Sequence, residues 1–340
     1  MIAQAKMAAM RARLLSHFGR QAWVRDDQGQ HRLCVYKGRD LQPVANDRVE
    51  IDIDATPAVI TNIVPRTNTV LRSESHRAKV LAANVDQVAI VISGAPLFSD
   101  ELLARMICAC AAEQIPGIVV LNKSDLAAET LRAEQQLAPF EHALQLLGWP
   151  VVRVAAKPIV GHDGHGRDSQ RHPQHLEPLR HRLLGLTTLI MGQSGMGKSS
   201  LLNALVPGIN AQTREISQAL QTGKHTTTAG LVVRMSDGQH PSFEPADGHG
   251  HEAGHAKAHP HDTWLVDTPG FQLFGLHHLS GTQLALGFPE WVEVHAHHGR
   301  CRFNNCTHQQ EPGCTIVQAA KNSQAAQRRL DLWQTLISTL

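Results

Sequence analysis

The sequence predicts a multidomain α/β protein with three successive parts. Short alternating strands separated by turn residues fill residues 21–72, which predicts a small all-β module. From Asn84 onward, strands alternate with helices, which predicts a parallel sheet with helices on both faces. Beyond His277 the pattern is helical, then cysteine-rich, then helical again. We therefore expect domains at 1–78, 79–276 and 277–340, and 340 residues are enough for this division.

The β module is expected to contain four strands joined by turns rich in Asp, Gly and Pro. The strands are expected at Gln21–Arg25, Arg32–Tyr36, Arg48–Ile53 and Ala58–Val64. The segment before them is basic and has no acid until Asp26; its cations are Lys6, Arg11, Arg13, Arg20 and Arg25. It is either a surface that contacts RNA or a solvated helix.

The α/β region begins with an apolar strand at Gln87–Ser93, an amphipathic run at Glu101–Gln114 and a second strand at Gly117–Leu121. This order is typical of a βαβ unit. Further along, Leu183–Met191 is expected to be a strand and Ser199–Leu205 a helix, with a glycine-rich loop between them.

That loop matches the G-x-x-x-x-G-K-[ST] pattern of a phosphate-binding loop. Its amides can wrap phosphate oxygens, Lys198 can reach the terminal phosphates, and the Ser199 hydroxyl can hold Mg²⁺. The helix N-terminus adds its dipole to the anion site. The candidate nucleotide ligands are Gly192, Gln193, Ser194, Gly195, Met196, Gly197, Lys198, Ser199 and Ser200.

A second motif identifies the base. Asn122, Lys123, Ser124 and Asp125 follow directly on an apolar run, at the carboxyl end of an expected parallel strand where open α/β sheets bind ligands. An aspartate there can accept both the N1–H and the exocyclic amine of guanine, while Asn122 lies at the other edge and Lys123 packs over the ring. The sequence therefore predicts a guanine nucleotide.

Two further elements complete a GTPase. Asp267 and Gly270 follow another expected strand, Thr263–Val266. Asp267 suits the Mg²⁺ shell and the Gly270 amide suits the γ-phosphate. The loop Gly223–Thr228 offers the hydroxyls of Thr226, Thr227 and Thr228 to the same Mg²⁺.

The order of these motifs differs from that in Ras-like proteins. The base-reading motif at 122–125 precedes the phosphate loop at 192–199, and no N-K-x-D follows residue 270. Either the motif at 122 is accidental, or the domain is circularly permuted, in which case Val151–Ala156 closes the guanine pocket. Permutation also makes the segment after Asp267 lead directly into the C-terminal domain. Loss of the γ-phosphate is therefore expected to change the conformation of that domain directly.

Three thiolates and one imidazole crowd together near the C-terminus, at Cys301, Cys306, His308 and Cys314. Four ligands of these types close a tetrahedral structural zinc site, although the spacing is not the common C-x₂-C pair and buried or reactive thiols are the alternative. Cys34, Cys108 and Cys110 are expected to be small core residues.

Two histidine-rich stretches, 161–181 and 238–262, contain five and six histidines among Gly, Pro and Asp. They are expected to be low-complexity insertions, either metal stores or pH-sensitive arms, or surface loops with a biased composition.

The formal net charge of +2 excludes a surface that binds polyanions everywhere, so nucleic-acid contact must come from local patches. Such patches are expected near the β module and beside the first cysteine ligand. No stretch is apolar enough to span a membrane or to act as a secretory signal, so we expect a cytoplasmic protein, with an organelle transit peptide as the alternative reading of the basic N-terminus.

With these motifs in place, the sequence resembles the ribosome small subunit-dependent GTPase A family of permuted GTPases. The resemblance covers nearly the whole chain from about Gly19, through 46–50, 82–88, 121–125, 192–200, 223–228, 267–271 and the cysteine cluster. It implies an OB-fold, a permuted GTPase domain and a zinc-binding C-terminal domain, acting with the small ribosomal subunit and its rRNA late in assembly of that subunit. Asn46 stands where the family usually has glycine, Ala155 and Ala156 lack a serine often found there, and the histidine-rich insertions are foreign to the pattern.

The resemblance leaves hydrolysis to be explained. The glutamine that orients water in Ras-like enzymes is replaced by Phe271, so intrinsic turnover is expected to be slow and a partner to activate it. His225 is the nearest polar candidate, and the family points the same way; the alternative is a histidine that contacts only RNA or solvent.

The leading hypothesis is a monomeric, ribosome-dependent GTPase that binds GTP and GDP with Mg²⁺ and one structural Zn²⁺. A metallochaperone GTPase with a histidine-rich metal store is the main alternative, and a non-catalytic RNA-binding scaffold is another.

Overall fold

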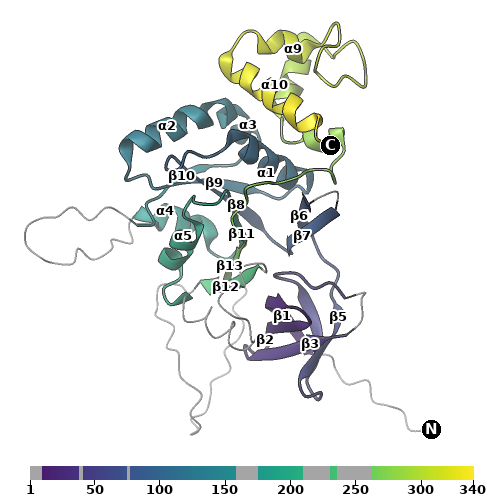
Figure 1. The fold of residues 1–340 in the computed structure, drawn as a ribbon, viewed down its shortest axis with the longest axis vertical. Coiled ribbons are helices and arrows are strands. Elements are labelled where there is room, and N and C mark those ends of the chain that lie inside the picture. The colour runs from purple at the N-terminus through teal and green to yellow at the C-terminus, as the bar shows by residue number, and fades with distance from the viewer. Residues whose placement is uncertain (1–9, 38–40, 75–76, 158–174, 210–229, 236–261) are drawn as a thin grey trace, which may run out of the picture.

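The computed structural model describes residues 10–37, 41–74, 77–157, 175–209, 230–235 and 262–340. Figure 1 shows a barrel at the N-terminal end, a sheet with helices on both faces in the middle and a helical unit at the C-terminal end. His225, the threonines at 226–228 and most of both histidine-rich stretches lie outside the described residues. None of the helices in the described ranges is long and apolar enough to cross a bilayer.

The barrel is a closed OB-fold with strand order β1-β2-β3-β5-β4. The pairing is antiparallel except between β3 and β5, which run parallel. Alternate side chains such as Val24, Val49 and Ile60 face inward and form a separate apolar core. The strands are β1 (Met10–Phe18), β2 (Gln21–Asp26), β3 (His31–Tyr36), β4 (Arg48–Asp52) and β5 (Ala58–Ile63).

The solvated-helix alternative for the basic N-terminal segment is wrong over its described part. Residues from Met10 onward form β1, which pairs with both β2 and β4 and so closes the barrel. Ala12 and Leu14 are buried in the barrel core, while Arg13 between them faces the neighbouring domain. In the sequence, Arg11 and Arg13 hide the alternation of buried and outward-facing residues that is typical of a strand.

A six-stranded sheet forms the middle of the molecule, in the order β10-β9-β8-β11-β13-β12. All neighbours run parallel except β12, which is antiparallel to β13 at one edge. The central strands are buried along their whole length, as expected when helices cover both faces. The strands are β8 (Gln87–Ser93), β9 (Gly117–Asn122), β10 (Val151–Arg153), β11 (Thr187–Met191), β12 (Leu231–Met235) and β13 (Thr263–Asp267).

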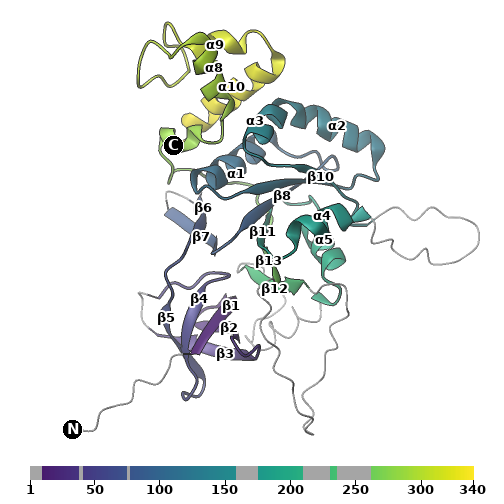
Figure 2. The same ribbon diagram turned by 180° about the vertical axis from the view of Figure 1, so that it is seen from behind.

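Helices lie on both sides of this sheet, as both views in Figures 1 and 2 show. On one side are α1 (Asp100–Ala112), α2 (Ala127–Leu137), the 3₁₀ helix η1 (Ala138–Phe140) and α3 (Glu141–Leu146). On the other are α4 (Glu177–Leu183) and α5 (Lys198–Leu205).

Two expected boundaries in this region are corrected. The strand expected at Leu183–Met191 begins only at Thr187, because Leu183 ends α4 with its side chain buried. The end of the first histidine-rich stretch therefore belongs to a packed helix, which Leu179 and Leu183 anchor to the core. Apolar residues before a turn extended the expected strand too far.

A two-stranded hairpin, β6 (Thr69–Glu74) and β7 (Arg77–Ala83), follows the barrel and was not predicted as separate strands. It is bound to the segment after Asp267 by a hydrogen bond from the Ser73 amide to the Gly275 carbonyl at 2.9 Å. The domain boundary that we expect after residue 78 falls inside β7, so the hairpin joins the two domains instead of belonging to one of them.

The C-terminal unit packs four helices around aromatic side chains. Phe288, Trp291 and Trp333 contact one another with ring centroids 4.6 to 5.3 Å apart. The buried Arg329 lies against the Phe288 ring and pairs with Glu290 at 2.7 Å. The helices are α7 (Gly281–Ala285), α8 (Glu290–His298), α9 (Thr315–Ala320) and α10 (Gln324–Ile337), and the cysteine-containing loop lies between α8 and α9.

Asn46 occupies a left-handed position between the barrel and the sheet, with φ at 69°. This backbone conformation favours glycine, the residue expected here from the family resemblance, and it tolerates asparagine. Here the fully buried carboxamide adds contacts that glycine lacks: it accepts from Arg13 at 2.6 Å and donates to the carbonyls of Ala83 and Asn84 at 2.7 and 2.8 Å. Asn46 therefore fastens the barrel to the beginning of the sheet.

Replacing Asn46 tests this role. Asn46→Ala is expected to lower the free energy of unfolding by about 3 kcal/mol, because it loses buried hydrogen bonds and strains a left-handed backbone. Asn46→Gly loses the same bonds without the strain, so its loss is expected to be about 1 kcal/mol smaller. Denaturant unfolding of both variants measures the difference. Stability equal to that of the natural chain in both would contradict the role.

Candidate nucleotide and metal sites

The phosphate loop, the base-reading motif and Asp267 meet at one edge of the sheet. Asn122 ends β9, the phosphate loop follows β11, and Asp267 ends β13. These strands run parallel within the same sheet, so their carboxyl ends lie at the same edge. Segments far apart and in permuted order in the chain are thereby brought together.

Asn122 joins three of these segments through a side chain that is only 1 % exposed. Its Nδ2 donates to the Met196 carbonyl at 3.0 Å, within the phosphate loop. Its Oδ1 accepts from the amide of Ala156 at 3.1 Å, in the loop that follows β10. The expected base reader, phosphate loop and closing loop are thus held by one carboxamide.

The rest of the base-reading motif, residues 123–125, also lies beside the phosphate loop. Lys123 has φ at 61°, and its Nζ donates to the carbonyls of Ala95 and Gly195, the latter at 2.9 Å. The Ser124 amide donates to Val154 at 3.1 Å, and Asp125 is half-buried beside it. The side chain of Lys123 therefore lies across the mouth of the phosphate loop.

Glycines let the phosphate loop turn tightly. Gly192, Gly195 and Gly197 all have positive φ, between 86° and 149°. A Cβ at Gly192 would lie 2.4 Å from the Val91 carbonyl oxygen, and one at Gly197 would lie 2.4 Å from Nδ2 of Asn122. Only glycine fits either position.

Lys198 begins α5 and is buried. Its Nζ donates to the carbonyls of Gly192 and Gln193, both at 2.9 Å. Burial lowers the pKa of this amine, while nearby Asp267 raises it. Ser199 follows at the exposed first turn of the helix, and Ser200 is half-buried.

Asp267 is a carboxylate that lacks a full set of partners. Its Oδ1 is buried and has no hydrogen bond to any of the described residues. Burial raises the pKa of Asp267 to about 6, against the opposing effects of Lys198 and the Thr268 amide. An orphaned carboxylate oxygen beside a phosphate loop and an exposed serine fits a Mg²⁺ shell.

The segment after Asp267 packs against the phosphate loop. The Phe271 amide donates to the Gly192 carbonyl at 3.2 Å, and the Ser194 amide donates to the Phe271 carbonyl at 3.0 Å. A Cβ at Gly270 would lie 2.9 Å from Nζ of Lys198. The Phe271 ring is buried between Arg72 and Phe274, so it offers no group that could orient a water molecule.

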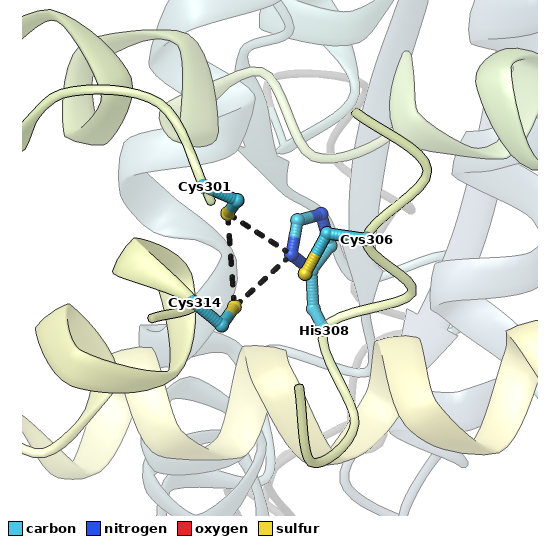
Figure 3. A group of neighbouring side chains, drawn as sticks. All are labelled: Cys301, Cys306, His308 and Cys314. Atoms are coloured by element: carbon cyan, nitrogen blue, oxygen red, sulfur yellow. Dashed lines mark hydrogen bonds between the residues drawn. The ribbon is translucent and has the colours of Figure 1, made fainter. Parts of the chain in front are cut away.

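The four C-terminal candidates converge (Figure 3). Their ligand atoms, from Cys301, Cys306, His308 and Cys314, all lie within 4.8 Å of one another and can hold a metal ion. Sγ of Cys301 lies 3.7 Å from both Nδ1 of His308 and Sγ of Cys314, and the latter two atoms are 3.3 Å apart. His308 has φ at 59°, and Cys314 caps α9 by accepting from the Val317 amide.

The remaining cysteines are core residues, as expected. Cys34, Cys108 and Cys110 are fully buried. Burial raises the pKa of the Cys34 thiol to about 11 and that of Cys108 to about 12, so neither is a reactive thiolate.

Comparisons with known proteins agree with this geometry. The RsgA GTPase family model matches residues 63–240. A Bordetella pertussis protein named small ribosomal subunit biogenesis GTPase RsgA is 37 % identical over 325 residues, which cover 95 % of this chain and 94 % of the relative.

The chain belongs to the RsgA GTPase family. A Burkholderia pseudomallei relative with the same name is 36 % identical, covering 96 % of this chain and 90 % of its own. The fold is that of the crystal structure of YjeQ from Thermotoga maritima, with a TM-score of 0.65 and 23 % identity over 97 % of this chain and 98 % of that one. YloQ, described as a circularly permuted GTPase, gives a TM-score of 0.60 and 22 % identity over 99 % of this chain and 97 % of its own. Permutation and not an accidental motif therefore accounts for the order of elements.

Two contacts at these sites were not predicted from the sequence. His295 lies with Nε2 at 3.6 Å from Sγ of Cys301, although it precedes the cluster on a different element. Gln193 accepts from the Ser99 amide at 2.8 Å and so ties the phosphate loop to the start of α1. No sequence motif marks either pair, because each contact forms only when the chain is folded.

The raised pKa of Asp267 predicts a specific pH dependence in the nucleotide-free protein. Between about pH 4 and 6 the folded state holds a proton that the unfolded state has lost, so stability falls as pH rises, by up to about 3 kcal/mol. Asp267→Asn should remove this fall and be more stable than the natural chain at pH 8. Denaturant unfolding at pH 4 and pH 8 measures it, and an unchanged pH dependence in the variant would contradict the burial of this charge.

Proposed function

We propose that this chain hydrolyses GTP to GDP and phosphate during late maturation of the small ribosomal subunit, and that hydrolysis times its release from the subunit. The observation that carries the proposal is the agreement along almost the whole chain with relatives named for this role, at 36 to 37 % identity. The assembled nucleotide site supports it independently.

The proposed nucleotide contacts follow from the geometry of the site. Amides of residues 192–200 surround the phosphates, and Lys198 exchanges its loop carbonyls for phosphate oxygens. Asp125 accepts the guanine donors, and Asn122 holds the phosphate loop through Met196 and the loop that closes the guanine pocket through Ala156. Ser199 would be a direct ligand of a Mg²⁺ bound with GTP, Asp267 would stabilise its shell, and one of Thr226, Thr227 and Thr228 would complete it.

Binding of the γ-phosphate requires room that segment 270–271 now takes. Gly270 lies against Lys198 and Ser194, on the face of the loop where a terminal phosphate is expected. We propose that GTP displaces this segment and that the Gly270 amide then donates to the γ-phosphate. Arg72 of β6 contacts Phe271, and Ser73 bonds to Gly275 four residues further on, so displacement of the segment would also move these contacts outside the nucleotide site.

Hydrolysis needs a group that orients water, and Phe271 cannot supply one. We propose His225 for this role, held in place only when the small subunit is bound. The basic side chains around the barrel and beside the first cysteine, including Arg300 and Arg302, are the proposed rRNA contacts. We further propose that the protein is a cytoplasmic monomer with the domain division given above.

The metal at the C-terminal cluster is proposed to be one structural Zn²⁺. In a tetrahedron with Zn–S bonds of about 2.3 Å, two thiolates are about 3.8 Å apart, and Cys301 and Cys314 are separated by 3.7 Å. Three thiolates and an imidazole fill all four positions, so the ion would have no open site for catalysis. It would instead fix the loop between α8 and α9 against Trp291 and Trp333, which contact His308.

The GTPase rate with purified small ribosomal subunits tests the proposal. Subunits are expected to raise the rate by at least tenfold, because the free site lacks a water-orienting group. His225→Ala should keep GTP affinity within about twofold and lose the stimulation. Arg132→Ala, an exposed change on α2, is the matched control and should respond like the natural chain.

One outcome would revise the mechanism, and two would count against the function. Full stimulation in His225→Ala removes His225 from the mechanism while leaving the function in place. Indifference to ribosomal subunits together with stimulation by Ni²⁺ or Zn²⁺ would favour a metallochaperone GTPase. No hydrolysis in any condition would favour an RNA-binding scaffold.

A further inference from the structure

A polar cavity of about 440 Å³ separates the barrel from the sheet. It lies where β8, β11 and β13 begin, beside Asp86, Thr187 and Trp264, whereas the phosphate loop lies where these strands end. Five residues of strand separate the two edges by about 17 Å, so the cavity is not part of the nucleotide site. Three arginines from three barrel strands line it: Arg13 of β1, Arg25 of β2 and Arg48 of β4.

The arginines are arranged around one aromatic ring. The guanidinium of Arg13 lies over Trp264 at 4.3 Å from the ring centroid, and that of Arg25 lies 5.8 Å from the same centroid. Arg13 is only 7 % exposed and is held by Asn46 at 2.6 Å. Arg48 is exposed, so the cavity opens to solvent on its side. One fixed and two more accessible guanidinium groups therefore converge on a single space.

Four aspartates, Asp26, Asp27, Asp86 and Asp262, also line the cavity, and they offset only part of the charge of these arginines. Asp26 accepts from two amides and pairs with Arg32 at 2.7 Å, and Asp262 pairs with Arg234 at 2.6 Å. Asp86 accepts from the Thr187 amide at 2.7 Å. Within the described ranges, no carboxylate lies at ion-pairing distance from the three cavity arginines.

The electrostatic balance points the same way. Burial lowers the pKa of Arg13 to about 9, with a further decrease caused by Arg48, against opposing effects of Asp86 and Asp262. Burial is also the largest cause that lowers the pKa of Arg25 and of Arg48. At Arg48 this effect is opposed by Asp27 and Asp86. Because Asp26 and Asp262 are paired with arginines outside the cavity, three arginines face two carboxylates that have no such partner.

We propose that this interdomain cavity binds a phosphate group, held by the forked guanidinium groups of Arg25 and Arg48 above the fixed guanidinium of Arg13. Arginine pairs with phosphate through two parallel N–H···O bonds, and such charge-assisted bonds are the strong ones. The open side at Arg48 admits either a phosphodiester of an RNA strand or a free phosphorylated molecule. The bound anion adds counter-charge where three arginines face only two carboxylates that are not paired elsewhere.

Such a ligand would have a mechanical consequence. The arginines belong to the barrel, whereas Thr187 and Trp264 belong to the sheet. A phosphate bound between them holds the barrel in one orientation on the GTPase domain, at the end opposite the nucleotide. The site can therefore report occupancy of the barrel surface without contacting GTP.

Calorimetric titration of the full chain tests the proposal, with saturating Mg²⁺ and GDP present so that the phosphate loop is filled. The probes are orthophosphate and a short single-stranded RNA without terminal phosphates. Binding of either probe by the natural chain is expected to weaken at least tenfold in Arg25→Gln/Arg48→Gln, since two charge-assisted contacts are lost. Arg132→Gln, whose arginine is exposed on α2, should bind within twofold of the natural chain.

The outcomes separate the sources. Binding of orthophosphate that depends on Arg25 and Arg48 assigns the site to a free phosphorylated ligand, and RNA binding alone with the same dependence assigns it to a phosphodiester. The single variant Arg48→Lys, which keeps the charge and removes the fork, should lie between the natural chain and the double variant and guards against misfolding of the latter. If neither probe binds, or if both bind equally well to the double variant, the proposal is overturned.

Discussion

The buried carboxamide of Asn122 is the contact on which the nucleotide site depends. A circular permutation separates the base-reading motif from the phosphate loop by some seventy residues along the chain, so neither can position the other locally. Parallel pairing of β8 with β11 brings the two halves together, and Asn122 then fixes the loop at Met196 and the closing segment at Ala156. Because Asn122 is almost completely buried, leaving any of its polar atoms unpaired would cost about 1–3 kcal/mol, which keeps the three segments in register.

A second consequence of the permutation is that the segment after Asp267 has neighbours on two sides. Toward the nucleotide site, Phe271 bonds to the phosphate loop through its backbone; toward the barrel, Arg72 and Ser73 hold the same segment. Asp267 has an unpaired buried oxygen, and burial raises its pKa, which fits a carboxylate that would support a Mg²⁺ shell.

Much of this could be predicted from the sequence, because its motifs encode local geometry. Gly192 and Gly197 are required by backbone contacts that admit no Cβ, and the apolar runs of β8, β9 and β11 reflect burial on both faces. The four candidate metal ligands also converge as expected. Sequence reasoning failed where a residue serves a neighbouring element: Arg13 gave β1 the appearance of a charged segment, and Leu183 ends a helix although its apolar character extended a strand. The hairpin β6–β7 does not stand out in the sequence because polar and charged residues interrupt both strands, although Val70, Leu81 and Ala82 belong to the core.

The central claim is that Asn122 couples recognition of the base to the shape of the phosphate loop. Affinity of Asn122→Ala for inorganic triphosphate, a ligand with no base, tests this most directly when compared with its affinity for GTP. If the carboxamide shapes the loop, binding of both ligands weakens by at least tenfold, since the Met196 and Ala156 contacts are lost together. Unchanged triphosphate binding alongside weakened GTP binding would show that Asn122 acts on the base alone and would contradict the account.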